Sequence, residues 1–287
     1  MQMEAKHMKE RTVPPQAGAY ARYLRAEERS GGTIEKYLRE VGAFARWLEG
    51  RPVTKEAAAG WKAHLQGAGR APATINAKLA AVNKYLLFLG RPDCRVRPLR
   101  LQRKLFRDAG RDLDREEYSR LTAAARAAGK ERLALLMEAI CATGIRVSEI
   151  KYLTVEAAQR GKAEIALKGK IRTILIPNKL CRKLLKYAGK RKIASGEVFL
   201  TRGGTSLSRK QIWAEMKGLC QRAGVEPGKV FPHNLRHLFA RTFYRVCRDV
   251  ARLADVLGHS SIETTRVYLI STGAEHAKTL EQMRLVS

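Results

Sequence analysis

The chain has 287 residues, and 56 Lys and Arg against 27 Asp and Glu give it a formal net charge of +29. Hydrophobic residues make up 45% of it, which is enough for packed cores and excludes a disordered basic tail. Even the apolar run at residues 133–145 is interrupted by Glu138, so the sequence excludes a transmembrane protein. The first residues are charged and lack the apolar segment of a secretory signal, so we expect a cytoplasmic location.

The cysteine and histidine pattern argues against disulfides and metal. The cysteines are odd in number and none forms a CxxC pair, which predicts reduced thiols. His233 and His237, one helical turn apart, form the only pair with zinc-ligand spacing, and neither cysteine nor acidic partners lie near them. Because a Gly-rich phosphate loop is also missing, we expect no metal, nucleotide or other cofactor.

The positive charge is spread over both halves of the chain. A basic excess of this size is typical of proteins that bind a polyanion, because neutralising phosphates releases counterions. A surface kept charged for solubility is the alternative, but such surfaces usually carry both signs in comparable amounts. Double-stranded DNA or another nucleic acid is therefore the expected partner, and a membrane is not.

The first third of the chain predicts a small helical domain within residues 1–92. Apolar residues recur at three- and four-residue spacing at residues 33–49 and 74–89, and a further helix is expected at residues 54–66. Residues 93–111 are then rich in Arg and contain prolines, so they are expected to form a basic interdomain linker. This linker could lie along a phosphate backbone or serve only as an exposed tether.

Residues 112–287 predict a second domain that is α+β, mostly helical with a small antiparallel β-sheet. Two short strands are expected at residues 163–167 and 173–176, with a turn at residues 168–172 between them. Helices are expected on both sides of this hairpin, at residues 114–118, 132–142, 177–188, 208–223, 234–246, 250–257, 261–269 and 274–284.

The second domain also contains a series of basic and hydroxylic residues in short motifs. Arg146 lies in ATGIRVSE, His233 and Arg236 are three residues apart in PHNLRH, and Tyr268 follows the Gly-His pair by nine residues. Taken singly, each has an ordinary explanation: Arg146 could be a surface charge paired with Glu149, and Tyr268 could be a core residue. What distinguishes them is their order along the chain, which is Arg146, Lys168, His233, Arg236, His259, Tyr268.

In this order the residues resemble the catalytic set of the tyrosine recombinase, or phage integrase, family. The resemblance covers residues 112–270 and implies the catalytic domain of that family, preceded by a helical domain that binds the DNA core site. The length of the chain is similar to that of the compact Xer-like members or mobile-element integrases of the family. The implied activity is site-specific strand exchange through a Holliday junction, used for DNA integration, excision or chromosome-dimer resolution.

The chemistry of phosphodiester cleavage agrees with the resemblance. Arginine suits the oxygens of a phosphate because its planar fork donates two parallel hydrogen bonds and stays charged, which predicts a clamp of Arg146 and Arg236. Tyr268 would be the nucleophile that forms a 3′-phosphotyrosine. Lys168 would protonate the leaving 5′ oxygen, with Lys170 as second choice and Arg172 contacting the DNA backbone.

The resemblance implies the remaining roles and the partners. His233 would assist proton transfer, His259 would hydrogen-bond the phosphate, and Glu149 would orient the site. A homo-tetramer would act on two recombination sites, with the C-terminal helix at residues 274–284 packed on a neighbouring protomer or on its own domain. Accessory DNA-bending or excision factors could take part. A type IB topoisomerase-like enzyme and a catalytically silent DNA-binding regulator remain the alternatives.

Overall fold

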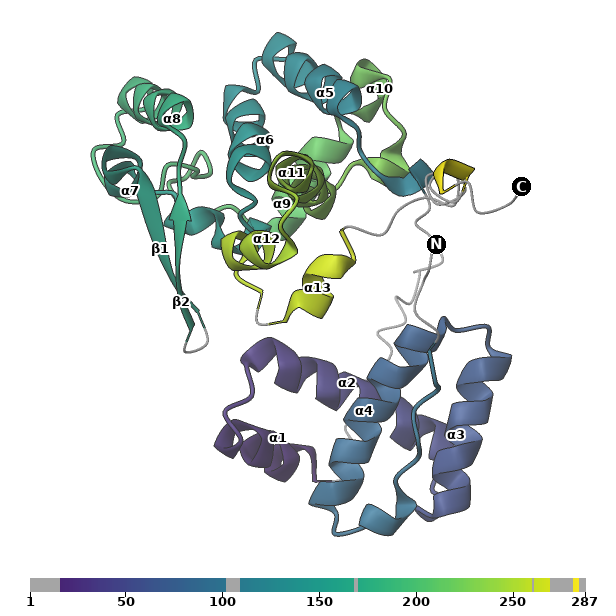
Figure 1. The fold of residues 1–287 in the computed structure, drawn as a ribbon. Helices are drawn as coiled ribbons and strands as arrows, with labels where there is room; N and C mark the ends of the chain where they lie inside the picture. The colour runs from purple at the N-terminus through teal and green to yellow at the C-terminus, as the bar shows by residue number, and fades with distance from the viewer. Residues whose placement is uncertain (1–15, 102–108, 168–169, 260, 269–280, 284–287) are drawn as a thin grey trace, which may run out of the picture. The chain divides into compact units, whose positions relative to one another are not determined.

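The computed structural model describes residues 16–101, 109–167, 170–259, 261–268 and 281–283. The chain divides into an N-terminal unit of residues 1–103 and a C-terminal unit of residues 104–287 (Figure 1). Among the helices that the structure describes, none combines the length and the apolar character needed to cross a membrane.

Amphipathic helices build the N-terminal unit, as the sequence predicts. Phe44 of one helix packs with Trp61 of the next, and Leu79 lies in the same buried cluster, so the three apolar stripes meet in one core. The Thr54 side chain accepts a hydrogen bond from the Ala57 N–H and so caps its helix. The elements of the described part are α1 (Ala17–Ala26), α2 (Gly31–Leu48), α3 (Lys55–Gly67), α4 (Pro72–Phe88) and the short 3-10 helix η1 (Pro92–Cys94).

The first part of the expected linker belongs to this unit. The side-chain amide of Asn83 pairs with both the N–H and the C=O of Val96, at 2.9 and 2.8 Å. Asn76 pairs in the same way with Leu99, at 2.8 and 2.9 Å. An amide side chain can donate and accept at once, so each Asn makes the pair of backbone hydrogen bonds that a neighbouring β-strand would otherwise make. Residues 94–99 are therefore held along α4 by these side chains. Residues 102–108 lie outside the described part.

The C-terminal unit surrounds the buried helix α6. Its elements in the described part are η2 (Ala109–Arg111), α5 (Arg115–Ala127), α6 (Glu131–Thr143), η3 (Val147–Tyr152), α7 (Val155–Arg160), β1 (Lys162–Leu167), β2 (Lys170–Leu175), α8 (Asn178–Lys190), α9 (Arg209–Lys217), α10 (Cys220–Ala223), η4 (Pro227–Lys229), α11 (Pro232–Cys247), α12 (Val250–Leu257) and α13 (Ile262–Arg266). Helix α6 packs against α5, α8, α9 and α11. All five cysteines are free thiols, as predicted: Cys94, Cys141, Cys181, Cys220 and Cys247.

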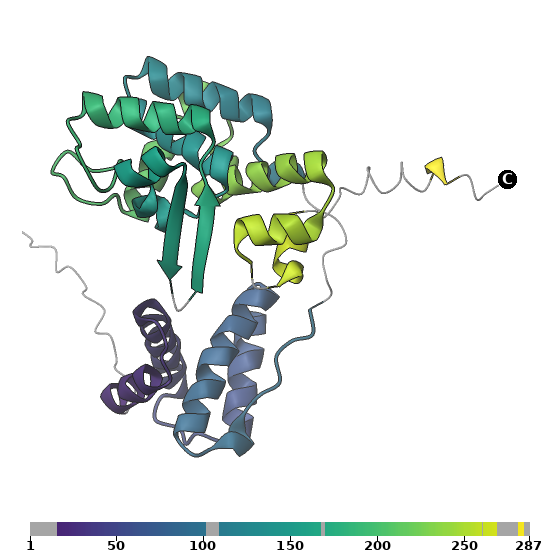
Figure 2. The ribbon, with the colours of Figure 1, turned by 60° about the vertical axis from the view of Figure 1, so that its left-hand side comes forward.

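The β-hairpin is longer than expected. Strands β1 and β2 pair antiparallel (Figure 2). In their register Ile165 lies opposite Arg172. The predicted turn at residues 168–172 is wrong, because Lys170 already pairs with Leu167 and only residues 168–169 separate the strands. The expected helix at residues 208–223 is likewise divided into α9 and α10. The helix expected at residues 274–284 lies almost entirely outside the described residues.

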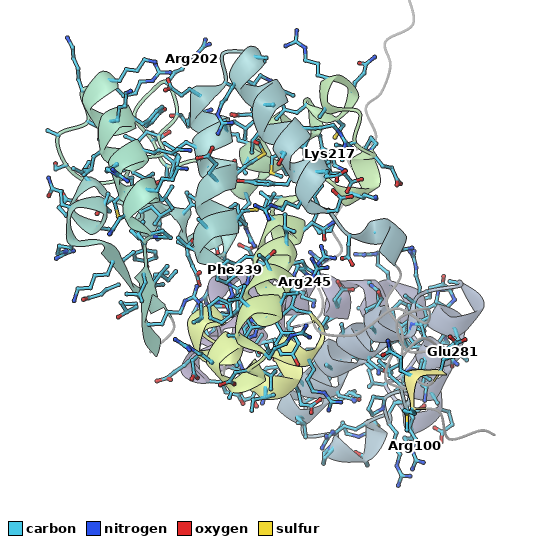
Figure 3. All side chains as sticks on the ribbon, turned by 45° about the horizontal axis from the view of Figure 1, so that its top comes forward. Arg100, Arg202, Lys217, Phe239, Arg245 and Glu281 are labelled. Carbon is cyan, nitrogen blue, oxygen red and sulfur yellow. The ribbon has the colours of Figure 1, made fainter. Side chains whose placement is uncertain are left out.

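A glycine sets the point where α6 ends. Gly144 has a φ of 65°, in the left-handed region, and closes the helix as its C-cap. A Cβ at this position would collide with the ring of Phe239, which lies on α11 (Figure 3). The chain therefore leaves α6 close to α11, and this turn delivers Arg146 to the next element.

Candidate active site

Arg146 is fixed by the first turn that follows α6. Its backbone is extended, and η3 begins immediately after it. The Glu149 carboxylate accepts from the Arg146 N–H at 3.0 Å and from its Nη1 at 2.9 Å, while Nη2 donates to the Gly258 carbonyl at 3.3 Å. Glu149 thus holds Arg146 through two hydrogen bonds, which agrees with the orienting role that the resemblance implies.

Arg236 is the most deeply buried cation of the cluster. It lies on the first turns of α11 and is 1% exposed. Its guanidinium donates to the carbonyls of Gly144 and Leu257 and, at 2.9 Å, to Nε2 of His259. Burial lowers the pKa of Arg236 to about 10, while hydrogen bonding with Tyr268 raises it. The side chain therefore stays charged at neutral pH.

His259 is held in one tautomer. An arginine can only donate, so the 2.9 Å contact with Arg236 requires Nε2 to be the acceptor. Nδ1 then carries the proton and donates to the Thr265 hydroxyl at 2.8 Å. Thr265 is fully buried on α13. Both ring nitrogens are thus engaged within the protein, so a hydrogen bond from His259 Nε2 to a phosphate requires Arg236 to release Nε2 and Nε2 to gain a proton.

Protonation of His259 is expected to destabilise the fold. Burial and the charge of Arg236 lower its pKa from 6.5 to about 4. Between these pH values the unfolded chain binds a proton that the folded chain does not, so stability is highest above pH 6.5 and falls toward pH 4. Urea unfolding at pH 7.5 and 5.0 should differ by about 1 to 2 kcal/mol from this residue. His259→Gln should reduce that difference, and an equal difference in both proteins would contradict the assignment.

Tyr268 lies among three histidine rings. It is 5% exposed and follows α13 directly. Its ring stacks on His259 with centroids 5.7 Å apart and meets His237 edge-on at 4.6 Å; His233 lies at 6.1 Å. Burial and Arg236 lower the pKa of His233, so this imidazole is neutral at neutral pH. His233 and His237 thus pack with the tyrosine. In the described part, no group of three or more His, Cys, Asp or Glu could hold a metal ion.

Arg172 also reaches this cluster, which the sequence did not predict. Its Nη2 donates to Glu149 at 2.5 Å and its Nη1 to the Leu257 carbonyl. With its side chain only 15% exposed, Arg172 is directed inward rather than available to contact the DNA backbone as expected. Burial favours the neutral form of Glu149, but the N–H and guanidinium of Arg146 and the charge of Arg172 hold its pKa below the usual value.

The predicted residues converge, with one outside the described part. The site is formed by the residue before η3, by α11 and by the segments after α12 and α13, which bring together Arg146, Arg236, His233, His259 and Tyr268. Lys168, the first choice for the general acid, lies outside the described residues, and nothing in the structure tests it or the side chain of Lys170. Three guanidiniums against the single carboxylate of Glu149 leave a positive cluster, which suits the charge of a phosphodiester and its transition state.

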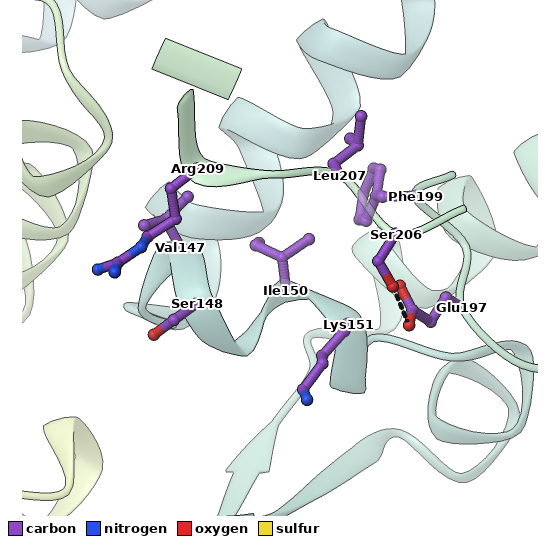
Figure 4. A pocket seen from close by; sticks show the side chains of 9 residues that line it. All are labelled: Val147, Ser148, Ile150, Lys151, Glu197, Phe199, Ser206, Leu207 and Arg209. Atoms are coloured by element: carbon purple, nitrogen blue, oxygen red, sulfur yellow. Dashed lines mark hydrogen bonds between the residues drawn. The ribbon is translucent and has the colours of Figure 1, made fainter. Parts of the chain in front are cut away.

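A pocket of about 200 Å³ flanks η3 (Figure 4). Ser148 and Arg209 lie on one side of it, and Ser206 donates to Glu197 on the other. Ser148, Lys151 and Arg209 are exposed. Apolar residues also line the pocket: Val147, Ile150, Phe199 and Leu207. The hydroxyl of Ser148, the ammonium of Lys151 and the guanidinium of Arg209 are groups of the kind that bind phosphate oxygens.

Comparison with known proteins identifies both units. The Phage integrase family matches residues 111–275, and the Phage integrase, N-terminal SAM-like domain matches residues 18–92. The Tyrosine recombinase XerA of Thermococcus kodakarensis is 30% identical over 274 residues, which cover 92% of this chain and 93% of that protein.

Two solved structures share the fold. XerH site-specific recombinase bound to palindromic difH substrate, in a post-cleavage complex, has a TM-score of 0.69 at 18% identity, over 92% of this chain and 83% of that one. A lambda integrase tetramer bound to a Holliday junction has a TM-score of 0.68 at 17% identity, over 88% and 75%. The chain therefore belongs to the phage integrase family and is an Xer-like tyrosine recombinase.

Proposed function

We propose that this recombinase cuts and rejoins double-stranded DNA through a covalent 3′-phosphotyrosine at Tyr268, and exchanges strands through a Holliday junction. The observation that supports this most directly is the position of Tyr268. Its ring lies on His259 and next to Arg236, which is held by two backbone carbonyls. A phenol at the edge of a guanidinium cluster can attack a phosphate bound by the same guanidiniums.

The proposed reaction divides into two balanced steps. The Tyr268 oxygen attacks phosphorus, the bond to the 5′ oxygen breaks, and the 3′-phosphotyrosine forms while Arg146 and Arg236 stabilise the charge on the non-bridging oxygens. Neutral His233 can accept the phenolic proton, and Lys168 or Lys170 supplies one to the 5′ oxygen. Attack by a 5′ hydroxyl of the other duplex reverses these transfers and restores Tyr268. Because the ester conserves the bond energy, no nucleotide is consumed.

The assembly proposed for this reaction is a homo-tetramer on two recombination sites. Support comes from the shared fold with the lambda integrase tetramer on a Holliday junction and from the net charge of +29, which suits a polyanion. The segment at residues 274–284 would couple protomers. Truncation before Ala274 should then weaken oligomerisation on DNA, measured by analytical ultracentrifugation, and unchanged oligomers would favour packing within one protomer.

A suicide-substrate experiment tests the proposed function. The full chain is incubated with a library of nicked duplexes. Cleavage near the nick releases a short fragment that carries the 5′ hydroxyl, and once this fragment dissociates the covalent complex cannot be religated and accumulates. An adduct on a denaturing gel, with the DNA mapped to Tyr268 by mass spectrometry, supports the proposal. Binding without any adduct would favour a regulator. Relaxation of supercoiled plasmids of any sequence, without exchange between two sites, would favour a topoisomerase-like enzyme.

The pocket beside η3 makes a separate prediction about affinity. Arg209→Ala should weaken binding to all duplexes alike and lower the slope of log Kd against log salt by about 1, because one phosphate contact is lost. Fluorescence anisotropy between 50 and 300 mM salt measures the slope. Arg182→Ala on α8 is the control, since this exposed arginine does not line the pocket. An equal effect of both variants would mean that only net charge matters.

A further inference from the structure

Arg172 connects the hairpin to two other parts of the active site. On one side its guanidinium binds Glu149, the residue that orients Arg146. On the other it binds the Leu257 carbonyl, which also accepts from Arg236 at 2.8 Å. Leu257 is the last residue of α12, so its carbonyl lies at the negative end of that helix, where a cation is stabilised.

The surroundings of Arg172 are shaped for its side chain. A Cβ on Gly258 would collide with the Arg172 Cδ and lie 2.7 Å from its Nη1, so the glycine leaves the path open. Gly258 itself has a φ of 62°, which favours glycine for a second reason. Burial lowers the pKa of Arg172 and Glu149 raises it, which marks a buried charge that depends on its partner.

The position of Arg172 in the strand relates it to the tip of the hairpin. Arg172 is two residues from Lys170, which pairs with Leu167 at the last position of the register. At about 3.4 Å per residue, the anchored position is about 7 Å along the strand from that last pair. Strand β1 packs on η3 and α7, so the Arg172 side chain adds an attachment of β2 to the end of α12.

We propose that Arg172 is a positioning residue that fixes the hairpin against Glu149 and the end of α12, so that a hairpin lysine meets the leaving 5′ oxygen. This inference rests on the proposed function, in which Lys168 or Lys170 supplies the proton. It assigns Arg172 to departure of the leaving group rather than to binding of DNA or attack by the tyrosine. The effect of losing Arg172 should therefore depend on the leaving group.

A substrate with sulfur in place of the bridging 5′ oxygen separates these roles. The P–S bond breaks to release a thiolate that needs no proton, whereas the oxygen leaving group takes one from the lysine. Arg172→Gln should slow single-turnover cleavage of the oxygen substrate by roughly 10- to 100-fold, within the range of general acid catalysis. On the sulfur substrate its rate should return to within about 3-fold of the unmodified protein, because the leaving group then needs no proton from the lysine.

The matched variants make the result decisive. Lys168→Ala and Lys170→Ala are measured in parallel. The lysine whose substitution slows cleavage of the oxygen substrate but not of the sulfur substrate is the general acid that Arg172 positions. Arg172→Lys, which keeps the charge but cannot bind both partners with a fork, should give an intermediate defect that sulfur also rescues. Circular dichroism and DNA binding are recorded for each variant, so that rates refer to folded, bound protein.

Each outcome has one meaning. An Arg172→Gln defect of the same size on both substrates, or no defect, overturns the positioning role. If Arg172→Gln does not fold, the same comparison with Arg172→Lys decides. If the unmodified protein forms no adduct with either substrate, the proposed function fails instead. An adduct that forms normally, with no sulfur rescue of Arg172 variants, leaves the function standing and rejects only this inference.

Discussion

Tyr268→Phe is expected to abolish the covalent DNA adduct, at least about 10⁴-fold below the unmodified protein, because the nucleophilic oxygen is gone. The phenyl ring can keep its place, since Tyr268 is buried among the histidine rings and packs with Leu253 and Leu257. DNA affinity should therefore stay within a few-fold of normal. The measurement is the fraction of suicide substrate trapped on a denaturing gel, with binding followed by gel shift.

Tyr244→Phe is the matched control. Tyr244 lies on α11 and packs against the same cluster, so the substitution removes a hydroxyl from similar surroundings. This variant should form the adduct at the normal rate. An adduct that persists in Tyr268→Phe and disappears in Tyr244→Phe would move the nucleophile to α11. The sulfur substrate should not rescue Tyr268→Phe, because easier departure does not replace a missing attacking group.

Arg236→Ala is expected to slow cleavage by about 10² to 10³-fold, the usual effect of removing one preorganised donor to a developing negative charge. The loss also leaves the Gly144 and Leu257 carbonyls and His259 Nε2 without this donor. Arg236→Lys should recover little, because one ammonium cannot span three acceptors. Single-turnover cleavage at saturating protein measures the rate, and the sulfur substrate should not restore it.

Arg241→Ala separates catalysis from folding. Arg241 is also a largely buried arginine on α11, and it binds the Leu113 carbonyl at 2.6 Å and Asp112 at 3.3 Å. Its removal should lower the free energy of unfolding but leave the cleavage rate of folded, bound protein within a few-fold of normal. If Arg241→Ala and Arg236→Ala slow cleavage equally, the effect of Arg236 lies in packing and not in the phosphate clamp.

Much of the fold follows from periodicity that can be read in the chain. The apolar spacing at residues 33–49 and 74–89 predicts helices that the structure contains as α2 and α4, because a buried face must recur every three or four residues. The same rule places His233 and Arg236 on one face of α11. The charge of +29 and the order of the site motifs indicated DNA and the family that the comparisons then showed.

The direction of one missed residue follows from the register of its strand. Arg172, Ile174 and Ile176 alternate with exposed Thr173 and Leu175, so Arg172 falls on the inward face of its strand. Extending β2 by three residues from the predicted start would have placed it there. The predicted turn at residues 168–172 left Arg172 outside the strand, so its inward direction was not predicted.

The sequence by itself determined most of the helices, the presence of the hairpin, the polyanionic nature of the partner and the family, since each depends on residues close together or on composition. Only the tertiary structure decided which hydrogen bonds hold the arginines of the site. Arg236 and Gly144 are 92 positions apart, Arg146 and Gly258 are 112 apart, and Arg172 and Leu257 are 85 apart. These bonds end on backbone carbonyls, which every residue has. No side-chain pattern therefore marks them, and they appear only when the packing of α6, α11 and α12 brings those carbonyls together.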